Sequence, residues 1–389
     1  MEGLDRLTPL WLGPLALAAG VWALGRLRVP ATWLRALALL GTAGVALWAC
    51  ALFVAFDPTT TGLQFVRVLP LVAELGVNYH VGVDGISLGL VTVVCFIVPW
   101  LLLAGGATPE DSSPRALAAT LVVVASFVGA LLSLNLVPFL LFSELATLAL
   151  AFLLGTTGGP GRVESATRFY LVSVTGSLLV WAVWLVVATL HGEQTGITSF
   201  DWIAAPGTSA PALIQTEVPV VDRWWTNQTT LFAALSLGLA LRAPLVPFHG
   251  WLRPVARSAS TTGVVLLAAG GMPLAVYGFL RFALPLFPAA ALAWGPLLSA
   301  FAAAAVFYGA WVAIAQRDLR ATALGLVSAQ LMLVMLGVFL ASVQSWNGSL
   351  LHLTTHALVS TSLLLLVGML EARRGTRALE AFGGIARPM

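Results

Sequence analysis

The sequence predicts an all-α fold, a polytopic bundle of transmembrane helices. Hydrophobic residues make up 59% of the 389 residues and charged residues only 9%, whereas about a quarter of the residues of a soluble domain are charged. The apolar residues gather into eleven stretches, each close to the ~20 residues that cross the hydrocarbon core of a bilayer. Composition therefore overrules the length, which in a soluble chain would suggest two or three domains.

The eleven predicted helices follow one another with mostly short connections. Asn135 and Pro138 supply the turn between the fourth and fifth helices, which almost touch in the sequence. Two connections are long, residues 56–85 and 191–228, and their content of Pro, Thr, Asp and Trp indicates ordered loops rather than separate domains. The helices are expected at residues 9–26, 33–55, 86–105, 116–134, 136–155, 168–190, 229–251, 261–283, 289–315, 322–342 and 349–371.

The arginines predict the orientation of this bundle. All 19 basic residues are arginines. Fourteen of them fall on the connections after odd-numbered helices or in the C-terminal tail, four fall on the other side, and Arg242 lies within a span. Because positively charged loops stay in the cytoplasm, the N-terminus is expected outside and the C-terminus in the cytoplasm.

Composition and motifs exclude several classes of function. The basic balance would suit nucleic acid, but the arginines are scattered between apolar spans, so topology explains them and the lipid bilayer is the expected partner. Cys50 and Cys95 lie inside apolar spans and are too few and too far apart to form a metal or iron–sulfur site. The sequence shows no glycine fingerprint after a strand, no P-loop and no hydrolase triad. A stand-alone enzyme is therefore not expected.

Two charged residues fall in the middle of predicted helices. Glu144 lies in the fifth helix and Arg242 in the seventh, at comparable depth, so an ion pair between them is possible. A charge at the bilayer centre costs roughly 3 kcal/mol on insertion scales and needs a partner or a water-filled path. The pair is either a charge switch in a proton path or a structural link between packed helices, and these two residues alone do not decide between them.

The seventh helix is predicted to be broken. Pro244 and Pro247 each remove a backbone donor and clash with the preceding turn. Such a break at membrane depth is tolerated where it lines a cavity or is buried in protein, and broken helices recur at the ion sites of transporters. His249 follows at once and can titrate near neutral pH.

Other polar residues lie in the last predicted helices. His352 and His356 are four residues apart and share one face of the eleventh helix, but no third metal ligand accompanies them. Gln330 is expected to hydrogen-bond between helices. Asp84 at the start of the third helix is interpreted as a carboxylate favoured by the helix dipole, and Asp318 as a partner of Arg317 or Arg320.

Several motifs together resemble one membrane protein family. The resemblance covers nearly the whole chain, in order, and is to subunit M of the proton-translocating NADH–quinone oxidoreductases; related subunits occur in Mrp-type cation antiporters and membrane-bound hydrogenases. The motifs that carry it are VNYHVGVDGISLGLV (77–91), ATRFYLVSVTGSLL (166–179), RAPLVPFHGWL (242–252), VYGFLRFALPLFP (276–288), FYGAWVAIAQRDLRA (307–321) and the segment from LLHLTTHALVS onwards (350–386).

The resemblance implies roles for particular residues. Glu144 takes the place of the family's glutamate in helix five, Arg242 that of the lysine in helix seven, and His356 that of the histidine in helix eleven. The family's lysine of helix eight falls on Pro273 and its histidine of helix ten on Gln330. Arginine does not readily lose its proton, unlike a buried lysine. The proton-translocation residues are thus expected to be Glu144, Arg242, His249, Gln330, His352 and His356, with the break at Pro244 and Pro247.

The resemblance also implies an organisation and partners. It divides the chain into an N-terminal three-helix region (1–115), a first antiporter-like repeat (116–283) and an incomplete second, inverted repeat with the cytoplasmic tail (284–389), because the family continues with further helices. The partners implied are other membrane-arm and antiporter-like subunits in the inner (cytoplasmic) membrane, with quinone, flavin and iron–sulfur clusters only in partner subunits. The alternatives are a subunit of a cation/proton antiporter, hydrogenase or carbon-uptake complex, or a structural copy that does not pump.

Overall fold

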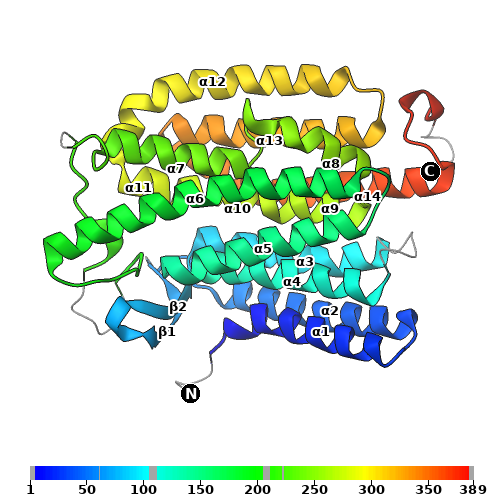
Figure 1. Cartoon of the computed structure of the whole chain (residues 1–389), viewed down its shortest axis with the longest axis horizontal. Coiled ribbons are helices and arrows are strands. Elements are labelled where there is room, and N and C mark those ends of the chain that lie inside the picture. Colours follow the sequence, from blue (N-terminus) through cyan, green and yellow to red (C-terminus); the bar gives the residue numbers. More distant parts are fainter. Residues whose placement is uncertain (1–4, 61, 105–111, 205–210, 221–222, 385–389) are drawn as a thin grey trace.

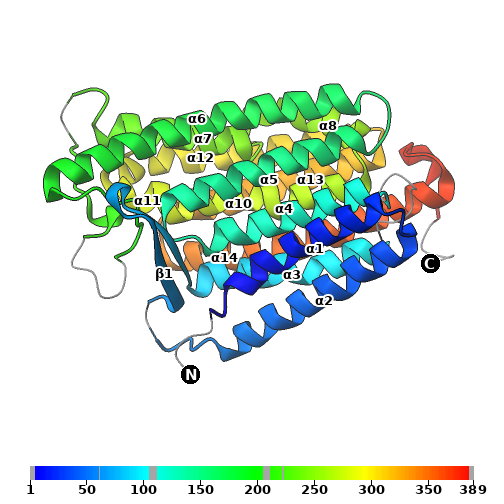
Figure 2. The same ribbon diagram turned by 60° about the horizontal axis from the view of Figure 1, so that its bottom comes forward.

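The computed structural model describes residues 5–60, 62–104, 112–204, 211–220 and 223–384. These residues form a bundle of long helices that run side by side (Figure 1; Figure 2). In Figure 1, α1 begins towards the left of the bundle, and α14, the last long helix, ends at the right. The predicted fold class, a bundle of transmembrane helices, is confirmed.

Ten helices of the described part are long and apolar enough to cross a membrane. Their ends agree with the predicted spans to within six residues. Asn135 lies between α4 and α5, as predicted, and its side chain caps α5 by accepting a hydrogen bond from the Val137 amide. The ten are α1 (Thr8–Arg26), α2 (Ala31–Ala55), α3 (Gly85–Ala104), α4 (Pro114–Leu132), α5 (Leu136–Thr156), α6 (Arg162–Thr195), the composite helix Thr261–Leu286, α12 (Pro288–Ile314), α13 (Leu319–Phe339) and α14 (Val343–Arg374).

The predicted seventh helix is broken at the position that its two prolines predicted. Helix α7 (Gln228–Arg242) ends just before Pro244, and the chain resumes in a short 3₁₀ turn (Phe248–Trp251) and α8 (Leu252–Ser258). Neither Pro244 nor Pro247 has an amide hydrogen to donate. The helical hydrogen bonds therefore stop at the Ala243 amide, which donates to the Leu239 carbonyl.

The composite helix Thr261–Leu286 contains two π turns that the sequence pattern did not predict. It consists of α9 (Thr261–Leu266), α10 (Met272–Gly278) and α11 (Leu284–Leu286), joined by wider turns at Leu267–Gly271 and Phe279–Ala283. Each π turn ends two residues before a proline, Pro273 or Pro285. A proline leaves the carbonyl four residues earlier without its helical donor. That carbonyl belongs to Ala269 or Arg281, in the middle of each turn, so the prolines explain where the helix widens.

The long connection after α2 is ordered, as expected, but it contains a β-hairpin that an all-α reading did not include. Strand β1 (Gln64–Val72) pairs antiparallel with β2 (Val77–Val83), with Leu69 opposite Tyr79. β-branched and aromatic residues, which favour strands, are frequent in both segments. Gly76 makes the turn with φ +65°, a left-handed conformation that glycine adopts without a steric penalty.

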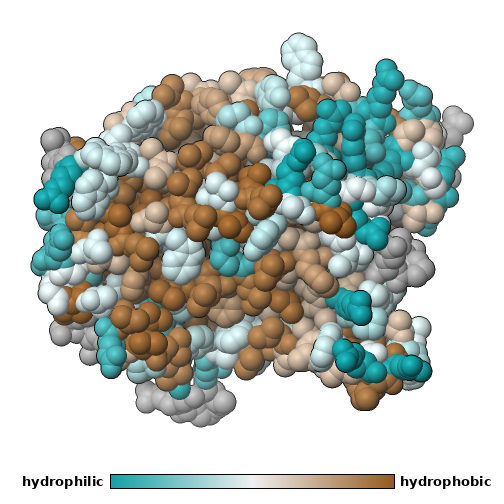
Figure 3. Space-filling view, in the orientation of Figure 1, coloured by the Kyte–Doolittle hydropathy of each residue, from teal (hydrophilic) through white to brown (hydrophobic). Residues whose placement is uncertain are grey.

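The core lies in the middle of the bundle. Helices α4 and Thr261–Leu286 are the most buried, while α1, α2 and α12 are the least buried and lie at the outer edges (Figure 1). Figure 3 shows a hydrophobic belt across the middle of one face, with hydrophilic residues gathered mainly towards the two ends of the helices. This distribution is that of a multi-pass membrane protein, with apolar side chains facing lipid or other membrane chains.

Candidate proton-translocation site

The site is built on a close crossing of α6 and α7. A Cβ added to Gly238 would lie 2.6 Å from the Gly176 carbonyl oxygen, and one added to Gly176 would lie 2.5 Å from the Gly238 carbonyl oxygen. Only glycines allow the two backbones to meet in this way. The crossing places Ser177 of α6 beside Arg242, which is one helical turn beyond Gly238.

Arg242 and Glu144, the two charged residues predicted at similar depth, form an ion pair. The Arg242 Nη1 donates to the Glu144 Oε1 at 2.7 Å and to the Ser177 Oγ at 2.5 Å. Its Nη2 donates to the Oγ and the carbonyl of Ser143 and to the Thr147 Oγ1 at 3.2 Å. The positive charge also lies at the C-terminus of α7, where the helix dipole favours it. The guanidinium thus has several acceptors, of which only one is charged.

The two partners differ in exposure. The Arg242 side chain is 10% exposed, whereas that of Glu144 is 29% exposed. Leu141, Leu145 and Leu148, which flank Glu144 along α5, are themselves exposed. The carboxylate therefore lies at the border between the bundle interior and an apolar outer face.

A small cavity lies on the inner side of Arg242. Its volume is about 20 Å³, and it is lined by Arg242, by Ser143 and Thr147 of α5, by Ser173 of α6 and by the first π turn, among other residues. A water molecule needs roughly 10–15 Å³ of such space and two or more polar partners. The cavity satisfies both conditions, so it can hold about one water between the guanidinium and the π turn.

His356 lies against the same π turn. It is 1% exposed, and the backbone of Ala268 in the π turn faces its ring. Neither ring nitrogen has a side-chain hydrogen bond within the described part of the chain. The ring of His352 is 6.5 Å from that of His356, on the same face of α14, as their spacing predicted. The π turn is therefore flanked by the cavity beside Arg242 and by this pair of histidines.

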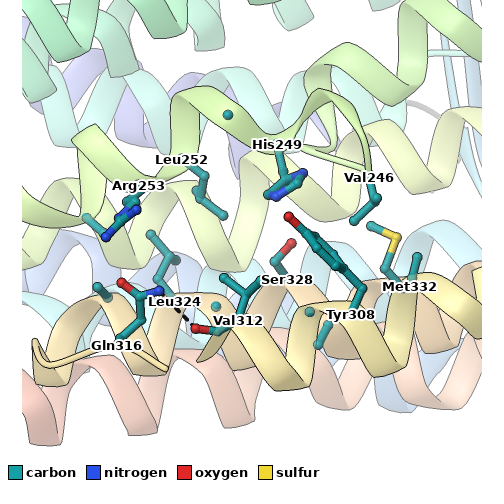
Figure 4. A pocket seen from close by; sticks show the side chains of 17 residues that line it. Val246, His249, Leu252, Arg253, Tyr308, Val312, Gln316, Leu324, Ser328 and Met332 are labelled. Carbon is teal, nitrogen blue, oxygen red and sulfur yellow. Dashed lines mark hydrogen bonds between the residues drawn. The ribbon is translucent and has the colours of Figure 1, made fainter. Parts of the chain in front are cut away.

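Two other predicted site residues are not gathered at this centre. His249 follows the break in helix seven, and its ring makes an edge contact with Tyr308 at 5.6 Å, in a groove beside α12 and α13 (Figure 4). Gln330 is half-buried on α13, and its side-chain oxygen accepts no hydrogen bond from any described residue. The predicted helix–helix hydrogen bond of Gln330 is therefore not made through this oxygen by the described residues.

Two further buried ion pairs lie near the ends of the bundle. Arg281, in the second π turn, pairs with Asp84 at the start of α3. Asp84 also accepts from the Ser87 amide at 3.0 Å, so the predicted helix-capping role is present together with an ion pair that was not predicted. Burial alone would raise the pKa of the Asp84 carboxyl, but Arg281 and the hydrogen bonds from Ser87 outweigh it and hold that pKa below its usual value.

At the other end, the prediction for Asp318 was wrong. Asp318 caps α13 through the Ala321 amide, at 2.9 Å, instead of pairing with Arg317 or Arg320. Arg320 pairs with Glu371 of α14 at 2.5 Å and donates to the Ala259 carbonyl and the Thr261 hydroxyl. Glu371 also accepts from Arg377 at 2.5 Å. This cluster ties α8, α13 and α14 together.

The described residues were also compared with the ligand sets that bind metal ions. In the ranges that it describes, no three His, Cys, Asp or Glu side chains gather as a metal site would require. His352 and His356 have no third potential ligand beside them there.

Comparison with known proteins identifies the family. The family described as NADH:quinone oxidoreductase/Mrp antiporter, transmembrane, matches residues 133–389. The chain belongs to this family. It is 33% identical over 384 residues to NADH-quinone oxidoreductase subunit M of Rhodobacter capsulatus, a match that covers 97% of this chain and 72% of that protein. The resemblance predicted from the motifs is thus confirmed.

Solved structures of relatives agree. Respiratory complex I from Thermus thermophilus contains a chain with a TM-score of 0.81 and 25% identity, over 96% of this chain and 73% of that one. The Mrp complex from a Dietzia species contains another, with a TM-score of 0.77 over 95% of this chain and 38% of that one; at 23% identity it shows the fold alone.

Proposed function

We propose that this member of the family translocates protons as a membrane subunit of an NADH–quinone oxidoreductase-type complex, with Glu144 as the group that takes up and releases the proton. The observation that carries the proposal is the partly buried pair of Glu144 and Arg242 at the end of a broken helix. A charge within the membrane is expensive and is usually tied to an ion or proton pathway. The family membership supplies the biological setting.

Arg242 acts in this proposal as a fixed positive charge. A guanidinium stays protonated in proteins, so it does not release a proton to the path. When Glu144 is ionised, the pair is complete; when Glu144 is protonated, Arg242 still has the hydroxyls of Ser143, Thr147 and Ser177 as acceptors. The site can therefore exist with Glu144 in either protonation state, which a proton-carrying carboxyl needs.

Other membrane subunits are the proposed partners. The exposed part of Glu144 would face hydrocarbon if nothing covered the outer side of α5, at a cost of the order given above. A neighbouring membrane chain on this face would remove that cost and could pass protons to the carboxylate. Respiratory complex I and the Mrp complex, which contain similar chains, are both complexes.

The remaining features follow from the same assignment. Redox cofactors such as quinone, flavin and iron–sulfur clusters are assigned to partner subunits. The protein is assigned to the inner (cytoplasmic) membrane, with its N-terminus outside. The arginine bias in the sequence supports this orientation, although Arg387 lies outside the described residues. His249, Gln330, His352 and His356 are assigned to the path beyond Arg242, and residues 116–283, which contain the broken helix, to the first repeat.

Glu144→Gln tests the proposal. Glutamine keeps the shape and can still accept a hydrogen bond from Arg242, but it cannot carry a proton. We expect proton uptake by native membrane vesicles, driven by NADH oxidation, to fall at least about tenfold, within the range of proton-transfer effects, with the assembled complex still present. Glu164→Gln is the control, because this carboxylate is exposed at the start of α6. Undiminished pumping by Glu144→Gln would refute the assignment.

Arg242→Lys separates the pumping reading from that of a structural copy. A lysine ammonium can still pair with Glu144, although it offers three donors where arginine has five. We expect the complex to assemble and to pump at no less than about half the normal rate, well above the tenfold losses that follow removal of a proton-transfer group. The control is Arg168→Lys in an exposed pair. Loss of assembly in Arg242→Lys alone would identify Arg242 as a structural anchor.

An ion other than the proton is the second candidate, because the family description also includes Mrp antiporters. Proton uptake by the native membrane vesicles described above distinguishes a proton pump from a cation/proton antiporter. Proton uptake that requires added sodium, and that a sodium ionophore abolishes, would favour a cation/proton antiporter, whereas uptake without sodium supports proton pumping.

A further inference from the structure

A groove runs along the outside of the bundle next to the broken helix. One wall is the 3₁₀ turn Phe248–Trp251 with α8, and the other is α12 and α13 (Figure 4). Its volume is about 330 Å³. The side chains of Leu252, Val312, Leu324 and Met332 give it an apolar lining, with His249 and Tyr308 on opposite sides.

Small residues keep the groove open. Ala305 and Gly309 of α12 and Gly325 and Ala329 of α13 all line it. A Cβ added to Gly309 would lie 3.1 Å from the Ala329 Cβ, so the two helices pack closely here. No large side chain from these four positions fills the space above them, and a smooth apolar channel results.

A basic opening continues the groove at the end of the bundle that carries the C-terminal tail. A second hollow, of about 630 Å³, is lined by Arg253, Arg257 and Arg317 with Asp318 and Gln316. Arg253 and Gln316 line both spaces, which therefore adjoin. The apolar groove thus lies next to a hollow lined by cationic side chains.

The three arginines of this opening lack carboxylate partners. Arg253, Arg257 and Arg317 are all exposed, and none forms an ion pair with a carboxylate of the described residues. Asp318, the acidic residue beside them, is used to cap α13. Within the described residues, no ion pair therefore neutralises these three positive charges.

Charge and lining together favour a lipid over a protein segment. The groove is apolar, as an acyl chain is, and the hollow beside it is lined by three exposed arginines. Basic pockets between membrane helices bind anionic lipid headgroups.

We propose that this groove binds one anionic phospholipid, with its phosphate between Arg253, Arg257 and Arg317 and one acyl chain along the apolar lining. The lipid would fill the space between α8, which continues the broken helix, and the pair α12–α13. It would thereby stabilise the position of the segment that follows the break relative to α12 and α13. This binding does not depend on Glu144 carrying a proton.

Native mass spectrometry of the assembly purified from its membrane tests the proposal. After delipidation, the assembly is titrated with phosphatidylglycerol or with phosphatidylcholine, and inorganic phosphate is added as the free-anion competitor. We expect one phosphatidylglycerol to be retained, phosphatidylcholine to bind much more weakly, and phosphate to displace neither. Equal retention of the two lipids, or displacement by phosphate, would overturn the assignment.

Variants locate the site. The triple change Arg253→Gln, Arg257→Gln and Arg317→Gln should weaken phosphatidylglycerol binding about a hundredfold, since each arginine near an anionic lipid contributes about a fivefold effect. The matched control is Arg28→Gln, Arg373→Gln and Arg374→Gln, which removes three exposed arginines that do not line the groove. Equal affinity in the two triple variants would contradict the proposal.

Two further changes test whether the apolar groove holds the acyl chain of the lipid. Val312→Trp fills the channel without altering charge, so it should also weaken retention, even if the triple variant fails to assemble. A photoactivatable benzoylphenylalanine at position 308, in place of Tyr308, should crosslink to a lipid. A crosslink to another polypeptide in place of lipid, or unchanged lipid retention in Val312→Trp, would overturn the proposal.

Discussion

Three partly buried arginine–carboxylate pairs in the described part of the chain differ in what else each guanidinium binds. At the centre, Arg242 binds Glu144, three side-chain hydroxyls and the Ser143 carbonyl, beside a cavity large enough for about one water. Near one end, Arg320 binds Glu371, the Ala259 carbonyl and the Thr261 hydroxyl, and Glu371 is shared with Arg377. Near the other, Asp84 is fixed to its own helix by Ser87.

This difference distinguishes a pair that can change its charge state from pairs that hold helices together. Hydroxyl groups rotate and can donate or accept, so the surroundings of Arg242 can adjust when Glu144 is protonated. Arg320 has only one such hydroxyl among its described partners, and its carboxylate partner Glu371 is also held by Arg377. Removal of a charge should therefore affect folding most at the Arg320–Glu371 pair and function most at the central pair.

The largest effect on stability is expected for Arg320→Gln. The change leaves the Ala259 carbonyl without its charged donor and removes one of the two cations that Glu371 binds. Breaking a buried pair by removing one partner costs about 3–5 kcal/mol. Thermal unfolding of the purified protein in lipid nanodiscs measures it, with the exposed Arg373→Gln as the control. A loss no larger than that of the control would remove the distinction between the pairs.

A smaller effect is expected for Gly238→Ala. The new methyl group would lie against the Gly176 carbonyl, so α6 and α7 must separate and Ser177 must move away from Arg242. Overpacking of this kind costs about 1–3 kcal/mol. Gly20→Ala in α1 is the matched control, because nothing lies within 4 Å of its added Cβ. The same unfolding measurement should show a loss for Gly238→Ala and none for Gly20→Ala; equal behaviour would mean that the crossing is not tight.

The smallest effect is expected for Ser177→Ala. Arg242 loses one of its hydroxyl acceptors but keeps Glu144, Ser143 and Thr147. The cost of one such hydrogen bond is about 1 kcal/mol, and proton pumping should persist at a reduced rate. Ser362→Ala, on an exposed face of α14, is the control. A complete loss of pumping in Ser177→Ala would show that this hydroxyl is part of the proton path itself and not only an acceptor for Arg242.

Much of the fold could be predicted because membrane helices are coded by composition over long stretches. The ten long apolar helices, the break before Pro244 and the pairing of Glu144 with Arg242 follow from hydropathy, proline chemistry and depth in the membrane. The β-hairpin was missed because a short hairpin in a loop is a weak signal beside the long apolar helices. Its alternation of Val and aromatic residues in 77–83 was the clue.

Features that depend on tertiary contacts were not predictable. The pairs Asp84–Arg281 and Arg320–Glu371 join residues 197 and 51 positions apart, and no local pattern specifies such partners. The π turns were missed because helical periodicity changes little over five residues, although Pro273 and Pro285 mark them in retrospect. The groove beside α8 exists only because Gly309 and Gly325 meet small residues across a helix interface.

The most direct test of the central claim is infrared difference spectroscopy of the assembled complex during turnover. If Glu144 takes up and releases the proton, a carboxylic-acid carbonyl band should appear and disappear with turnover, shift in heavy water, and be absent from Glu144→Gln while remaining in Glu164→Gln. A band that persists unchanged in Glu144→Gln, or no band that depends on Glu144, would contradict the account and leave the pair with Arg242 a structural link.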